Sequence, residues 1–195
     1  AANDTEGAFD ADIDVNSGVL TFGNSATTTI GGALTQTQTG AGVTGTVSIG
    51  ANLTLDKDGA MNFESASTLL GTANETITLT TNGADNSDIT FQSTLGNTSG
   101  EDITFDAGAL GDVVVTGALG DLGIGNVAVT NAFNVTFSST VDAFNFDQTA
   151  GAGTTTFTGA FDLAGAFAWD GKNLTINGAA NDTEGAFDAD IDVNS

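Results

Sequence analysis

Four side chains that carry oxygen stand at alternate positions near the start of the chain: Asp10, Asp12, Asp14 and Asn16. Carboxylate and amide oxygens are the ligands that Ca²⁺ prefers, so this spacing makes the segment a candidate calcium site. The pattern fails as an EF-hand loop, because Val15 stands at the sixth position, where glycine is needed. The twelfth position, where the loop needs glutamate, holds Thr21.

The same segment also fits an ordinary strand with Ile13 and Val15 inward and an acidic stripe outward. Alternate carboxylates on one strand lie about 7 Å apart, which is too far for three of them to share one ion. Neighbouring strands would have to supply the missing ligands. Two interpretations therefore stay open, a solvated acidic strand and a calcium-assisted strand. Calcium is the one cofactor that the sequence suggests, and the fold should not require any.

Residues for other chemistry are scarce. The chain has no Cys and no His, and Lys57 and Lys172 are its only bases. Thiolate metal sites and histidine bases are therefore excluded, and only paired carboxylates could catalyse, as in glycoside hydrolysis. Trp169 beside Asp170 is the one aromatic–acid pair typical of sugar binding. Because no two acids are placed together in an apolar cleft by the pattern, we expect no enzymatic activity.

The charge balance excludes two classes of partner. Asp and Glu number 25 against two Lys, for a formal net charge of -23. A surface of this sign repels the phosphates of nucleic acid and the headgroups of anionic membranes. The apolar runs are short, whereas a helix that crosses a bilayer needs about 20 consecutive apolar residues, so no membrane-spanning helix is expected either.

One short phrase recurs along the chain: Asn or Asp, an aliphatic residue, Thr, then an aliphatic residue or Phe. It occurs at 52–55, 88–91, 102–105, 134–137 and 173–176. Alternating apolar and polar residues predict half-buried strands. The alternation places four phenylalanines in a core, namely Phe91, Phe105, Phe137 and Phe157, and the preceding threonines outside.

Glycine- and asparagine-rich turns such as 82–87 and 96–100 separate the phrases. The chain is therefore predicted to be all-β. The same phrase returning in the same register favours a right-handed parallel β-solenoid, with tandem β-sandwiches as the alternative fold. With two strands per coil, a coil would take about 25 residues, and one repeat unit would hold roughly seven coils at ~4.8 Å each.

The first seventeen residues, AANDTEGAFDADIDVNS, return unchanged as residues 179–195. We interpret residues 1–178 as one full unit of a tandem array and residues 179–195 as the start of the next identical unit. Identical neighbouring units, joined end to end, are then the expected partners, and lateral contacts between fibres are a further expectation.

The Asx-aliphatic-Thr-Phe phrases, the Gly/Asn turns, the missing Cys and the acid excess resemble the repetitive β-solenoid segments of giant secreted bacterial surface proteins. These include filamentous-haemagglutinin-type proteins, autotransporter passengers and adhesin stalks. The resemblance implies export and an extracellular or cell-surface location. It predicts a structural repeat of an extracellular fibre or, as the alternative, the spacer of a bacterial adhesin whose binding function lies elsewhere.

Overall fold

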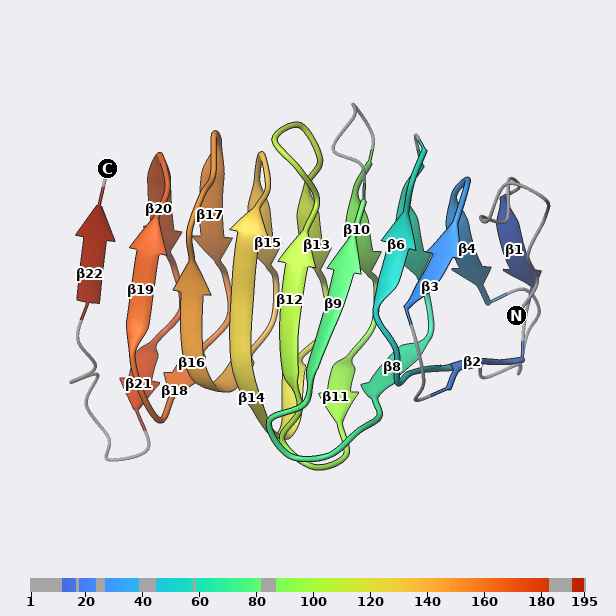
Figure 1. Ribbon diagram of the computed structural model, residues 1–195. Helices are drawn as coiled ribbons and strands as arrows, with labels where there is room; N and C mark the ends of the chain where they lie inside the picture. Colours follow the sequence, from blue (N-terminus) through green and yellow to red (C-terminus); the bar gives the residue numbers. More distant parts are fainter. Residues whose placement is uncertain are drawn as a thin grey trace.

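The fold is a right-handed parallel β-solenoid, seen from the side in Figure 1. This computed structural model describes residues 12–16, 18–23, 27–38, 45–57, 59–81, 87–182 and 191–194. These residues form strands and turns and contain no helix. All of their strand pairs are parallel, whereas the strands of β-sandwiches are antiparallel. The predicted β-solenoid is thus confirmed and the alternative of tandem sandwiches is wrong.

The first of the two sheets has 8 strands, one from each coil, and we call it the first face. Its strands are β1 (Ile13–Asn16), β4 (Leu34–Thr37), β7 (Met61–Phe63), β10 (Ile89–Phe91), β13 (Val113–Val115), β15 (Val135–Phe137), β17 (Thr154–Phe157) and β20 (Asn173–Ile176). All five recurring phrases form strands, and three of them, at 88–91, 134–137 and 173–176, lie on this face.

The 14-stranded second sheet folds around the rest of each coil in two series. The second face holds β2 (Val19–Phe22), β5 (Thr46–Ile49), β8 (Ala66–Leu69), β11 (Leu95–Asn97), β18 (Phe161–Leu163) and β21 (Ala180–Asp182). The third face holds β3 (Thr28–Ile30), β6 (Leu53–Leu55), β9 (Thr76–Thr80), β12 (Asp102–Asp106), β19 (Phe167–Asp170) and β22 (Ile191–Asn194).

Two long strands, β14 (Leu119–Asn131) and β16 (Val141–Gln148), run through both of these faces and join them into one sheet. A coil therefore has three sides, so the expectation of two strands per coil is wrong. The length of a coil also varies along the solenoid. Among paired strands it is shortest at several places, such as where Thr155 pairs with Leu174, and longest at others, such as where Met61 pairs with Ile89. The expected coil length falls between these two extremes.

The core is a column of apolar side chains that the three faces enclose. Phe91 and Phe105 are 0% exposed, and Phe137 and Phe157 are 1% exposed. The threonines that precede them, such as Thr90, are half-exposed on the outside. The predicted register is therefore confirmed, since a slip by one residue would reverse every side chain.

Aromatic rings stack between coils in the C-terminal half of the core. The ring of Phe157 lies 5.2 Å from that of Phe137 on the coil before and 4.5 Å from that of Phe161 on the second face. Burial of one such side chain stabilises the fold by about 1.5–3 kcal/mol. Contacts between coils, and not only within them, thus hold the solenoid together.

Candidate functional site

The candidate calcium segment lies at the first strand of the solenoid. Asp10 is outside the described residues, while Asp12 directly precedes β1, and Asp14 and Asn16 lie on its outward side; all three are exposed. The backbone N–H of Ala33 donates to Oδ1 of Asp12 (2.8 Å), and the hydroxyl of Thr37 donates to Oδ1 of Asn16 (2.7 Å). Two of the candidate ligand oxygens therefore already accept a hydrogen bond from the next coil.

No three acidic, histidine or cysteine side chains come together as a metal-binding group within the described residues. The alternate spacing along β1 explains this for the acidic stripe, because an extended strand keeps Asp12 and Asp14 about 7 Å apart. Calcium binding by this segment stays a prediction.

The Asx residue that opens the recurring phrase forms a ladder on the first face. Oδ1 of Asp88 accepts the backbone N–H of Asp112 (2.8 Å), and Oδ1 of Asp112 accepts that of Asn134 (2.9 Å). Oδ1 of Asn134 in turn accepts the N–H of Thr154 (3.0 Å), and its Nδ2 donates back to Asp112 (3.1 Å). Each side chain thus bonds the backbone of the same position one coil later.

A second Asx ladder runs along the third face. The carboxylate of Asp102 accepts the backbone N–H (2.6 Å) and the Nδ2 (3.0 Å) of Asn126. Oδ1 of Asn126 accepts Nδ2 of Asn145 (2.7 Å), whose own Oδ1 accepts the N–H of Ala166 (2.7 Å). We did not predict these ladders, although the constant Asx at the start of each phrase was the signal that could have indicated them.

Two corners between the second and third faces share one turn, formed by 72–75 and 98–101. Its third residue has positive φ, 63° for Asn74 and 81° for Gly100. In the second corner, the carboxylate of Glu101 accepts the N–H groups of Thr98 (3.0 Å) and Ser99 (2.8 Å) and the hydroxyl of Thr98. Burial opposes the charged form of Glu101, but these hydrogen bonds outweigh it and lower the pKa of the carboxyl. Acids at these corners hold turns in place.

Two acids face each other on the second face. Asp142 of β16 pairs directly with Asp162 of β18, and Oδ1 of Asp162 is buried without a hydrogen bond from the described residues. Partial burial and the negative charge of Asp162 raise the pKa of Asp142. Like charges directly opposite on paired strands destabilise a sheet, so this pair is a point of electrostatic strain.

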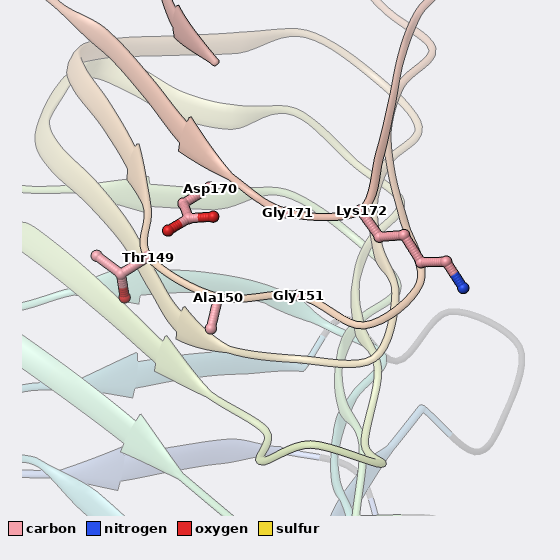
Figure 2. A pocket seen from close by; sticks show the side chains of 6 residues that line it. All are labelled: Thr149, Ala150, Gly151, Asp170, Gly171 and Lys172. Carbon is pink, nitrogen blue, oxygen red and sulfur yellow. The ribbon is translucent and has the colours of Figure 1, made fainter. Parts of the chain in front are cut away.

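An open hollow of ≈ 490 Å³ lies at the corner between the third and first faces (Figure 2). Its lining comes from two successive corner loops, residues 149–151 and 170–172. Figure 2 shows the Asp170 carboxylate near Thr149, while the Lys172 side chain extends away from both. Trp169 is only 3% exposed, and its indole N–H donates to Thr155 inside the core (3.2 Å). The pair of Trp169 and Asp170 therefore presents no aromatic platform to a sugar.

The two ends of the solenoid differ from its middle. Five apolar residues pack against the core but are only partly buried, and all belong to the first or last coil: Ile13, Leu20, Phe22, Leu174 and Ala180. Among the described residues, the backbone edges of these coils pair on one side only, because β1 and β22 each end a series of strands. Open edges of this kind are templates for a further strand.

The described parts of the two identical segments lie at opposite ends of the solenoid (Figure 1). The positions described in both copies, Ile13–Asn16 and Ile191–Asn194, are four-residue strands, as expected for equivalent positions of a tandem repeat. They do not lie on the same face. β1 pairs with β4 on the first face, whereas β22 pairs with β19 on the third.

Comparisons with known proteins found no matching family model, no similar curated protein and no similar solved structure. Within the described residues no helix is long and apolar enough to span a membrane.

Proposed function

We propose that the chain is a structural repeat of an extracellular or cell-surface fibre, in which identical units follow one another end to end. One observation carries the proposal: the same seventeen residues begin and end the chain, and their strands Ile13–Asn16 and Ile191–Asn194 lie at the two ends of the described solenoid. A solenoid coil cannot bury its apolar side chains without a neighbour, so stacked units stabilise each other.

The surface charge supports a solvated, elongated particle. A net charge of -23 keeps such particles apart in solution and leaves them soluble. The same repulsion favours the second candidate function, a spacer of an adhesin that stays single, because a fibre bundle would have to neutralise the acids between its members. Calcium at the acidic stripe of β1 would be one means of doing so.

Chains of one, two and three units provide the test. From β1 in the first coil to β22 in the eighth, a unit spans seven coils and two further faces. At ~4.8 Å per coil, the particle length in electron micrographs should grow by about 37 Å per added unit. Two-unit chains seen as two separate compact bodies would refute the tandem solenoid.

The same chains separate the two candidates. Sedimentation at rising protein concentration should show lateral association for a fibre and single particles for a spacer. Protease treatment of intact source cells tests the location, since an exposed repeat is lost while cytoplasmic markers persist.

A further inference from the structure

We propose that each unit is rotated about the solenoid axis by one face relative to the unit before it. In this turned junction, the third face of one unit continues into the first face of the next. This inference rests on the proposed tandem array, and it names the strands that form the interface. The partner is the next copy of the same unit, bound by parallel strand pairing across the open edges of the terminal coils.

The two ends of the chain show the two halves of one junction. An Ile-Asp-Val-Asn strand inside an array has one neighbour below and one above. The C-terminal copy shows the strand below, with Ile191 paired to Phe167 of β19. The N-terminal copy shows the strand above, with Ile13 paired to Leu34 of β4. Superposing the two copies, so that Ile13 falls on Ile191, places β4 of the next unit over the third face.

The following strand fits the same rotation. In the turned arrangement, β2 of the next unit lies on β20, so that Val-Leu-Thr-Phe stacks on Asn-Leu-Thr-Ile. Both sequences alternate in the same phase, with Leu20 and Leu174 half-buried towards the core and Thr21 and Thr175 exposed. Two incomplete apolar surfaces thus cover each other, and the threonines continue one outward column.

Coil length distinguishes this arrangement from an unrotated one. In the turned junction, Leu20 of the next unit stacks on Leu174. The number of residues in the coil between them equals that between Phe167 and Ile191, which are paired inside the solenoid. Without rotation, Ile191 would stack directly on Leu174. That coil would be shorter than the one that joins Thr155 to Leu174, which is among the shortest between described paired strands.

A consequence is that the array repeats its orientation only after every third unit, because each coil has three sides. Each side of the particle then shows the first, second and third faces in turn. A surface feature of one face, such as the acid pair of the second face, would appear on all three sides of a long array.

Disulfide trapping tests the junction, because the chain has no cysteine of its own. Ala168 and Asp192 are paired neighbours in the turned arrangement. Directly paired positions on adjacent strands lie within the Cα separation that a disulfide bridges. The variant Ala168→Cys/Asp192→Cys should therefore oxidise readily, whereas Thr175→Cys/Asp192→Cys should not. A matched control is Thr156→Cys/Thr175→Cys, since these residues pair inside the solenoid and must cross-link in either arrangement.

The outcomes separate this inference from the array itself. Cross-linking through Thr175 instead of Ala168 overturns the rotation and leaves the stacked array intact. If the control cross-links and neither junction variant does, the C-terminal copy does not stack on the solenoid, and both proposals are wrong. In a two-unit chain, Thr175→Cys of the first unit should also cross-link with Thr21→Cys of the second, which extends the test to the next strand of the junction.

Discussion

Removal of one side chain from the Asx ladder of the first face should lower the stability of the solenoid measurably. In Asn134→Ala, the N–H of Thr154 loses its acceptor (3.0 Å) and Asp112 loses the Nδ2 donor (3.1 Å). Asp112 keeps the backbone N–H of residue 134 (2.9 Å), so only one backbone donor is left without a partner. Thr154 is half-buried, so water replaces part of this bond. We expect a loss of about 1–2 kcal/mol in the free energy of unfolding.

Circular dichroism during heating measures this effect, and for a chain of this length the loss corresponds to a fall in Tm of roughly 3–6 °C. Asn177→Ala is the matched control, because Asn177 is exposed and its side chain makes no hydrogen bond with the described residues. That variant should stay within about 0.5 kcal/mol of the parent.

A carboxylate in place of the Asn134 amide separates the effect of hydrogen-bond geometry from the effect of charge. Asn134→Asp keeps the acceptor for Thr154 but turns a carboxylate towards that of Asp112. Its destabilisation should be present at neutral pH and should shrink at acid pH, where the carboxyls take up protons. Equal Tm values for Asn134→Ala and Asn177→Ala would refute the reasoning, because the ladder would then contribute nothing to stability.

Three further predictions concern other parts of the solenoid. Folding raises the pKa of Asp142, so the folded chain binds this proton more tightly than the unfolded chain does. Asp142 therefore lowers the free energy of unfolding as the pH rises from the unfolded pKa to the folded pKa. Asp142→Asn should therefore raise Tm at neutral pH, and the gain should vanish in acid; a gain independent of pH would contradict this. Phe157→Ala should cost about 3–5 kcal/mol in chemical denaturation, whereas Phe144→Ala, at a side chain that is 55% exposed, should cost less than half of that. If the acidic stripe of β1 binds calcium, Ca²⁺ should raise Tm more than Na⁺ at equal ionic strength, and Asp12→Asn/Asp14→Asn should remove the difference; an unchanged Tm in EDTA would end the calcium hypothesis.

Local alternation was sufficient to predict the strands and their inward faces. Asn134-Val135-Thr136-Phe137 fits only a strand with Val135 and Phe137 inside, because a half-buried strand has a period of two. The coil shape did not follow from the same pattern. Three sides could not be distinguished from two, because the strands of two faces merge into β14, where glycines such as Gly120 (φ 84°) break the alternation.

The partners of polar groups inside the solenoid could not be predicted from local sequence patterns either. Gln36 is fully buried, and its side-chain amide accepts the N–H of Ser65 (3.0 Å) and donates to the hydroxyl of the same residue (2.8 Å). The two residues are 29 positions apart, so their pairing depends on the length of the coil between them. The corner carboxylate of Glu101 is a similar case, because its Thr-x-x-Glu spacing is typical of helix N-termini and here closes a turn between strands.

The Asx ladders have a fixed chemical direction along the solenoid. In both ladders the side-chain oxygen belongs to the earlier coil, and the backbone N–H that it binds belongs to the later one. A folded coil therefore offers a row of side-chain acceptors to the chain that follows, and the later coil offers its backbone N–H groups as the matching donors. Where the chain becomes available from its N-terminus, we expect growth in that direction, with one slow nucleation step and fast addition of each coil after it. A chain that emerges gradually with its N-terminus first would then order itself one coil at a time, using the finished part as its template.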